Sequence, residues 1–419
     1  MVYVCKLRYS SVGLIDGFRL PSALCARRVF RVDFRYWVTP DPRLYSFRCQ
    51  KIKCNLEVHL LHPKTLTMAI ETLKHLTILP QSTYIDALRF LPPLSALDRY
   101  IVSASFNSDS DEASISIHSF NTTNSPSLTL QSSFPSSSRV TSLKVAQKSL
   151  QNPLIAASTI TGSIHILFPN PIDASFQSEV SVPEKTLHLG SVSCLDLQEN
   201  GSECVSVGED GRVNLISVGD SALDYRRVFD SKGLVSYTAA RWASPTEFAT
   251  GGLGNALQWW DLRRAGGPVS QFKGNWAQGA TSGIVHSIDI HPSRKHTCVA
   301  GGSFGSVFAW DLRRPQQPIV LSGIDNGETA TCISESDVWE VQYDTFTSAS
   351  DHTNLSSKGV LPVMICSEDG ILAVLKQAEE PAELLAENCA INCFDIDRQN
   401  PSDVICSLEW ESIGLLTRA

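Results

Sequence analysis

The stretch Val205–Ile216, which reads Val-Ser-Val-Gly-Glu-Asp-Gly-Arg-Val-Asn-Leu-Ile, decides the fold. Apolar residues alternate with polar or small ones on both sides of Asp210-Gly211, as they do in strands with one buried face. Asp-Gly pairs tolerate the positive φ angles of the tight turns that join antiparallel strands. The stretch therefore predicts a β-hairpin with Gly211 in its turn.

The same hairpin pattern returns along the chain. It recurs at Ala156–Leu167, Ala249–Trp260, Val299–Trp310 and Ile365–Leu375. The turn residues follow one another at intervals of 49, 44, 50 and 65 residues, and they are Gly162, Gly211, Asn255, Gly305 and Gly370, with Asp210 and Asp369 before two of them. A polar insert, Asp344–Lys358, lengthens the last interval. Such a recurrence indicates a chain built from one repeated unit.

Two further marks complete the unit. Alternating apolar and polar residues predict a half-buried strand before three of the hairpins, at Cys194–Leu197, Ser287–Ile290 and Cys393–Ile396. Leu88-Arg89-Phe90 and Ala240-Arg241-Trp242 are variants of the same strand. Trp-Asp pairs close the third strand of two units, at Trp260-Asp261 and Trp310-Asp311. Four short strands per unit at this spacing are typical of WD40 proteins. We therefore predict an all-β, seven-bladed WD40 β-propeller with units at about 83–120, 138–168, 188–218, 232–263, 282–313, 335–376 and 390–418.

The last unit offers only three strands. The segment Glu71–Leu79 precedes the first unit and contains an apolar stretch, and we expect it to supply the missing outer strand of the last blade. This pairing closes the ring and removes two open sheet edges, which otherwise invite aggregation.

Three polar stretches are expected to be mobile loops and candidate phosphorylation sites. They are Phe106–Ala113, Asn121–Arg139 and Asp344–Lys358, all rich in Ser, Thr, Asn or Asp. Such composition does not support a packed core.

The first 67 residues differ from everything that follows. They hold 12 Lys and Arg against 4 Asp and Glu, a net charge of +8, whereas the remaining 23 basic and 39 acidic residues give −16. The segment matches no repeat, so the predicted propeller spans 68–419. We expect residues 1–67 to be a disordered basic extension, or a gene-model artefact with natural initiation at Met68. An organelle-targeting peptide and a basic nucleic-acid arm are the alternatives.

The composition restricts which kinds of partner are expected. A body this acidic argues against direct nucleic-acid binding, which depends on a positive surface. No run of about 18 apolar residues exists, so no membrane insertion is expected. The 12 cysteines form no Cys-x-x-Cys pair and have no neighbouring histidine cluster. They are interpreted as reduced, mostly buried residues, with no metal site.

Motifs that resemble enzyme sites fall within the repeat. Ala300–Val307 resembles a kinase glycine-rich loop, but no lysine strand or Asp-Phe-Gly triplet follows it. His188, Ser206 and Asp210 match the hydrogen-bonded set that often knits WD blades, and we predict a structural role for them. We expect no catalytic residues, no cofactor and no enzymatic activity.

Two copies of Trp-Asp-x-Arg are candidate protein-docking sites. They consist of Trp260, Asp261 and Arg263, and of Trp310, Asp311 and Arg313. This form resembles a motif of substrate receptors that dock on the adaptor of cullin-4 ubiquitin ligases. The competing interpretation is ordinary repeat sequence in which each Arg pairs with an acidic neighbour.

A family resemblance covers roughly Met68 to Ala419. Five stretches resemble, in their order along the chain, the nucleoporin forty-three family of WD40 proteins: Ala156–Leu167, Val205–Leu215, Val338–Val341, Cys366–Gly370 and the ending Ile391–Arg418. Departures are the N-terminal extension, a shorter stretch between the last two blades, and Leu375-Lys376 where Trp-Asp is common. The resemblance implies a non-enzymatic scaffold in the Y-shaped outer-ring complex of the nuclear pore, at the nuclear envelope. The implied partners are other subunits of that complex, among them an α-solenoid, and the implied role supports assembly and the transport of protein and mRNA.

Overall fold

The structure, a computed structural model, describes residues 73–419 apart from 95–97, 122–126, 150–151, 220, 255, 274–282, 315–317, 326–327, 330–332 and 351–359. Contacts divide the chain into two units, Met1–Thr67 and Met68–Ala419. The predicted basic extension, 1–67, and the predicted turn residue Asn255 lie outside the described residues. The described part is nearly all strand, and α2 (Thr345–Ser350) is the only helix within it.

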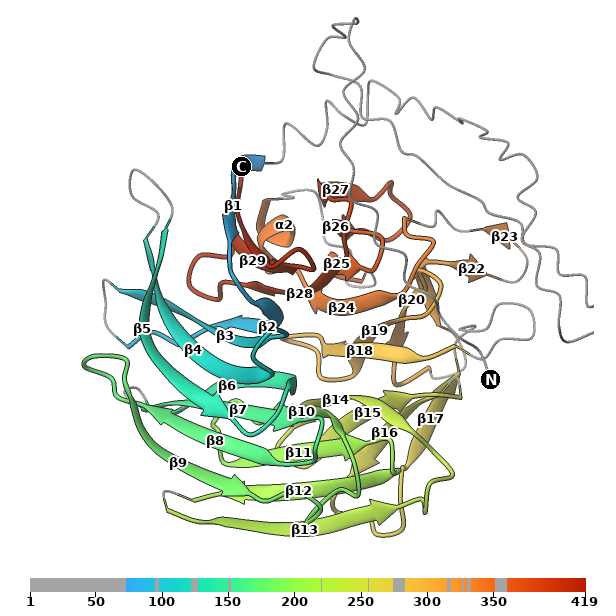
Figure 1. Cartoon of the computed structure of the whole chain (residues 1–419). Coiled ribbons are helices and arrows are strands. Elements are labelled where there is room, and N and C mark those ends of the chain that lie inside the picture. Colours follow the sequence, from blue (N-terminus) through green and yellow to red (C-terminus); the bar gives the residue numbers. More distant parts are fainter. Residues whose placement is uncertain are drawn as a thin grey trace, which may run out of the picture. The chain divides into compact units, whose positions relative to one another are not determined.

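The strands form seven four-stranded antiparallel sheets, which we call blades 1 to 7 in chain order (Figure 1). Blade 1 holds β2 (Tyr84–Phe90), β3 (Arg99–Asn107), β4 (Glu112–Asn121) and β5 (Ser127–Ser136). Blade 2 holds β6 (Val140–Ser149), β7 (Asn152–Thr159), β8 (Ile164–Pro169) and β9 (Phe176–Val182). Blade 3 holds β10 (Val192–Leu197), β11 (Glu203–Gly208), β12 (Arg212–Val218) and β13 (Leu223–Asp230). Blade 4 holds β14 (Tyr237–Ser244), β15 (Glu247–Gly252), β16 (Ala256–Asp261) and β17 (Ser270–Lys273).

The remaining blades follow the same plan. Blade 5 holds β18 (Val285–Ile290), β19 (Thr297–Gly302), β20 (Val307–Asp311) and β21 (Ile319–Ser322). A short hairpin, β22 (Ile324–Asp325) and β23 (Glu328–Thr329), lies in the linker to blade 6. Blade 6 holds β24 (Val338–Tyr343), β25 (Val363–Ser367), β26 (Ile371–Leu375) and β27 (Ala382–Ala386). Blade 7 holds β28 (Ile391–Ile396), β29 (Asp403–Leu408), β30 (Ser412–Arg418) and β1 (Leu73–Pro80).

The ring closes through β1, as predicted. This strand pairs antiparallel with β30, with Leu76 opposite Leu416 and Leu79 opposite Ile413. The first strand of each blade contacts the first strand of the next, from β2 through β6, β10, β14, β18 and β24 to β28, and β28 returns to β2. The seven-bladed WD40-type propeller and its closing strand are therefore confirmed.

The predicted turn glycines have the backbone that the hairpins require. Gly162, Gly211, Gly305 and Gly370 all have positive φ, between 66° and 95°. A side chain at Gly370 would place Cβ 2.2 Å from the carbonyl oxygen of Glu387, so the linker to the next blade packs directly on this turn. These turns are therefore fixed by both conformation and packing.

All three stretches predicted as loops contain regular structure. Phe106–Ala113 includes the end of β3 and the start of β4. Ser127–Ser136 forms β5, the outer strand of blade 1, whose residues alternate between exposed and half-buried. An outer strand faces solvent, so its polar composition resembles that of a loop. Within Asp344–Lys358, Asp344 caps α2, since its carboxylate accepts hydrogen bonds from the Phe346 backbone N–H at 3.1 Å and the Thr347 hydroxyl at 2.5 Å.

Candidate functional site

The two tryptophans of the Trp-Asp-x-Arg motifs are core residues. Trp260 on β16 is 2% exposed, and Trp310 on β20 is fully buried. The Trp260 indole N–H donates a hydrogen bond to the Thr250 hydroxyl at 2.9 Å, and its ring stacks on Phe248. Neither indole is available to a docking partner without unpacking its blade.

The aspartate and arginine of each motif pair with one another. Arg263 donates to the carboxylate of Asp261 from Nε at 2.8 Å and from Nη2 at 2.9 Å. Arg313 and Asp311 repeat the geometry, and the hydrogen bonds from Arg313 lower the pKa of Asp311 to about 2. The side chains of Arg263 and Arg313 are 66% and 73% exposed. The motifs thus form local ion pairs, and only the arginine heads lie on the surface.

Aspartates of three inner strands join neighbouring blades through hydrogen bonds. They are Asp196, Asp289 and Asp395, the third residues of the repeated Cys194–Leu197, Ser287–Ile290 and Cys393–Ile396 stretches. Each carboxylate accepts a hydrogen bond at 2.8 Å from the next blade, and the donors are the backbone N–H groups of Trp242, Tyr343 and Phe90. A buried carboxylate that receives such bonds fixes the angle between two blades.

The buried Arg89 and the half-buried Arg241 complete this ionic layer. Arg241 of blade 4 lies between Asp196 of blade 3 at 3.2 Å and Asp289 of blade 5 at 3.0 Å. Arg89 of blade 1 donates to Glu340 of blade 6 at 2.7 Å and to the Phe394 carbonyl of blade 7 at 3.1 Å.

Charge compensation keeps these arginines ionised inside the protein. Burial alone lowers an arginine pKa, but the neighbouring carboxylates outweigh it and raise the pKa of both Arg89 and Arg241 above the usual value. Compensated charges therefore join the inner strands in addition to the apolar clusters that span adjacent blades.

Sequence reasoning identified the strands around Arg89 and Arg241 as variants of the repeat but did not assign the arginines a role. The available signal was that Arg occupies the position of Asp196, Asp289 and Asp395 in other copies. Arg241 meets Asp196 and Asp289, which occupy equivalent positions in the two adjacent blades, once the blades form a ring. Arg89 instead reaches Glu340 of blade 6, two blades away.

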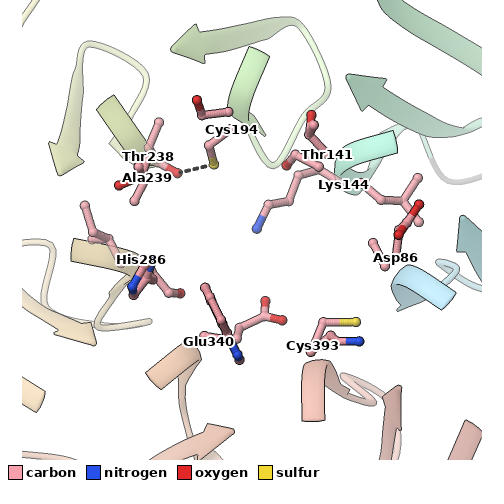
Figure 2. Close-up of a pocket in the computed structure, with 18 of the residues that line it drawn as sticks. Asp86, Thr141, Lys144, Cys194, Thr238, Ala239, His286, Glu340 and Cys393 are labelled. Atoms are coloured by element: carbon pink, nitrogen blue, oxygen red, sulfur yellow. Dashed lines mark hydrogen bonds between the residues drawn. The ribbon is translucent and has the colours of Figure 1, made fainter. Parts of the chain in front are cut away.

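A cavity of about 140 Å³ opens among the inner strands, and all seven blades line it. Figure 2 shows Lys144 extending toward its centre, with Asp86, His286 and Glu340 around it. Burial raises the pKa of Cys194 and lowers that of His286, although Asp337 lies 2.9 Å from the His286 ring. The Cys194 thiol therefore remains protonated, the opposite of what a nucleophile requires.

The third blade contains the predicted structural set. His188 lies 3.1 Å from Asp210 and 3.0 Å from Ser206, and His188 and Ser206 are fully buried. Burial raises the pKa of Asp210, but hydrogen bonds with His188 and the Leu189 backbone outweigh it, so the net pKa is lowered. The set joins the linker at His188 to the turn of the same blade.

We expected no Gly-x-Ser-x-Gly nucleophile motif in the sequence, and this expectation is wrong, because Gly301-Gly302-Ser303-Phe304-Gly305 matches the pattern. In the structure it forms the turn between two strands of blade 5, whereas the hydrolase motif joins a strand to a helix. The buried Ser303 hydroxyl accepts a hydrogen bond from the Ile284 backbone N–H at 3.1 Å. Its geometry is that of a structural turn residue.

Metal and membrane sites were sought among the described residues alone. There, no three His, Cys, Asp or Glu side chains group closely enough to hold a metal ion. In the same part of the chain, no helix is both long and apolar enough to cross a bilayer.

Comparison with known proteins identifies the family. No family model matches the chain. The chain is 55% identical over 353 residues to "Nuclear pore complex protein NUP43" of Arabidopsis thaliana, a match that covers 81% of this chain and 96% of that protein. It is 26% identical over 229 residues to "Nucleoporin Nup43" of Mus musculus and of Homo sapiens, covering 53% of each chain. The chain belongs to the Nup43 family of nucleoporins.

Proposed function

We propose that this protein is a non-enzymatic scaffold subunit of the nuclear pore complex at the nuclear envelope. The observation that carries the proposal is its close similarity to the Arabidopsis protein, whose name places that protein in the nuclear pore complex. More specifically, it joins the Y-shaped outer-ring complex beside an α-solenoid subunit, and it supports pore assembly and the transport of protein and mRNA.

The physics of the fold supports a scaffold. The closed ring is cross-linked by buried ion pairs such as Arg89–Glu340 and Arg241–Asp289, so its surfaces are preorganised before a partner arrives. A preorganised surface loses little conformational entropy on binding, which favours stable assembly.

A second candidate function is a substrate receptor of a cullin-4 ubiquitin ligase. The exposed heads of Arg263 and Arg313, repeated in adjacent blades, are the observation that favours it. Their bidentate pairing with Asp261 and Asp311 supports the structural interpretation instead, because each arginine already has a partner within its own turn.

Affinity purification of the tagged full chain from growing cells, together with imaging, tests the two candidates. We expect a continuous nuclear-rim signal and co-purification of outer-ring nucleoporins, both unchanged when Arg263 and Arg313 are replaced by Ala. Recovery of the cullin-4 adaptor in place of pore subunits, lost in the Arg263→Ala, Arg313→Ala variant, would reverse the ranking.

A further inference from the structure

Exposed apolar side chains gather on one face of the propeller. This linker face consists of the turns between the second and third strands of each blade and of the linkers between blades. Of the ten exposed large hydrophobic residues in the described part of the chain, five lie on it, whereas four lie on outer strands and one, Ile172, lies on the opposite face. The five are Ile160, Leu189, Leu234, Leu253 and Trp410, between 49% and 89% exposed.

Four of the five residues lie on successive turns and linkers of blades 2 to 4, and we call them the apolar arc: Ile160, Leu189, Leu234 and Leu253. The Leu189 backbone N–H donates to Asp210 in the turn of blade 3 at 2.9 Å. The Ser231 N–H donates to Gly211 of that turn at 3.0 Å, and the Leu234 N–H donates to Ser231 at 3.2 Å.

Backbone contacts also hold the two ends of the arc, at Leu253 and at Ile160. The Leu253 N–H donates to the Ser236 carbonyl of the preceding linker at 3.0 Å. At the other end, the turn at Gly162 packs against the Gly190 carbonyl, since a Cβ at Gly162 would lie 2.6 Å from that oxygen. Each side chain is therefore held on a turn or linker that is tied to its neighbour.

The other half of the linker face is acidic. Its turns and linkers in blades 6, 7 and 1 are residues 81–83, 108–112, 137–139, 333–337, 368–370, 387–390 and 409–411. Among them Arg139, which pairs with Asp86 at 2.7 Å, is the single Lys or Arg. They carry ten carboxylates, Asp109, Asp111, Glu112, Glu335, Asp337, Glu368, Asp369, Glu387, Glu409 and Glu411, which we call the acidic sector. Trp410, 65% exposed, lies between the last two of them.

We propose that the linker face docks a protein surface that carries aliphatic side chains beside a cluster of Lys and Arg. The aliphatic side chains contact the apolar arc, and the cationic ones face the acidic sector and Trp410. Ten carboxylates beside one arginine, whose charge Asp86 balances, attract such a surface over long range and repel an acidic partner such as nucleic acid. An indole between two carboxylates binds a cation through both its ring face and the flanking charges.

This inference rests on the proposed scaffold function and assigns it a surface. A hot spot at an interface combines an aromatic or apolar anchor with neighbouring groups that exclude water. Leu189, Leu234 and Trp410 have the exposure for that role, and the linkers that carry the leucines are fixed. Burial of the arc on binding also removes an apolar surface that a free protein would otherwise leave open to aggregation.

The test uses the tagged full chain in cells that lack the untagged copy. One variant combines Leu189→Ser with Leu234→Ser, a second combines Glu368→Lys with Glu409→Lys, and a third is Trp410→Ala. We expect each to lower the recovery of pore subunits about tenfold or more, as loss of a hot spot does. The thermal midpoint of each purified variant is measured beside it to establish that the ring is folded.

Matched controls lie elsewhere on the propeller. Ile172, 89% exposed like Leu234, lies on the opposite face, and Ile172→Ser controls for the loss of an exposed aliphatic side chain. Asp224 on β13 and Glu380 before β27 are both exposed, and their joint replacement by Lys makes the same change in net charge. Both controls should retain wild-type recovery.

A zero-length carbodiimide cross-linker, applied to isolated nuclear envelopes, tests the chemistry directly, because it joins carboxylates to lysines in contact. We expect amide links from Glu368 or Glu409 to lysines of another pore subunit. Folded linker-face variants with wild-type recovery would overturn the proposal, as would links from these residues to a second copy of this chain. A wild-type chain absent from the envelope would refute the scaffold function itself, which distinguishes the two failures.

Discussion

Replacing Arg89 by Met removes the cation that joins blades 1, 6 and 7. Glu340 is then left buried without its partner at 2.7 Å, and the Phe394 carbonyl loses a donor at 3.1 Å. Breaking one side of a buried pair costs about 3–5 kcal/mol. Unfolding entropy of ~2.1 cal/mol/K per residue, taken over roughly 350 residues, gives about 0.7 kcal/mol/K. The expected fall in Tm is therefore about 4–7 °C.

Differential scanning fluorimetry of the purified chain at pH 7 measures this shift. Adding Glu340→Leu to Arg89→Met should restore part of the loss, because no unpaired charge then remains. The recovery stays incomplete, since Glu340 also accepts a hydrogen bond from the Phe394 N–H at 3.2 Å.

The control for this prediction is Arg263→Met, which breaks an arginine–aspartate pair whose arginine is 66% exposed. Exposed pairs contribute about 0–1 kcal/mol, so its Tm should fall by less than about 2 °C. If Arg89→Met and Arg263→Met lowered the Tm equally, the buried ionic layer would not stabilise the ring as we infer.

Three other predictions concern the pairing of β1 with β30, which we call the clasp, the buried thiols and the buried histidines. Deleting residues 1–79 removes β1 and should abolish soluble expression, whereas deleting 1–67 should not; soluble, cooperatively unfolding 1–79 deletions would refute the role of the clasp. The seven described cysteines are free, and burial raises the pKa of Cys298 to about 12 and of Cys393 to about 11. A thiol reagent such as DTNB should therefore label both only after unfolding, and fast labelling of the native chain would contradict their burial. Burial lowers the pKa of His118 and His286 below 6.5, so the unfolded chain binds protons more readily than the folded one, and the Tm should fall as the pH drops from 7 toward 5. Replacing both histidines by Gln should make the Tm depend less on pH, and an unchanged dependence would exclude them as its cause.

Much of the fold was predictable because its signals are local. The Asp-Gly turn at Gly211 and the strand Cys194–Leu197 reveal a period within one unit, and the closing strand follows from the missing fourth strand of the last unit. Outer strands such as β5 were harder to predict, since solvent replaces one of their packing partners and polar composition becomes acceptable.

The sites were less accessible to sequence reasoning. The role of Arg89 depends on Glu340, which lies 251 positions away and becomes adjacent only when the ring forms. The apolar arc is likewise composed of single residues on separate linkers, none of which forms a motif. Periodicity therefore predicts the blades, whereas contacts between blades and a composite surface require the closed ring.

The clasp between β1 and β30 also sets the order in which this chain reaches its native state. Leu73 pairs with Arg418, so the strand that leaves the ribosome among the first meets its partner only after nearly all of the propeller has been synthesised. Pairing across so long a loop is slow, and unpaired strand edges in the meantime invite misassembly. Six blades can form before β30 is synthesised, but the seventh is completed only once β30 is available, which makes the open ring the species that chaperones would have to protect.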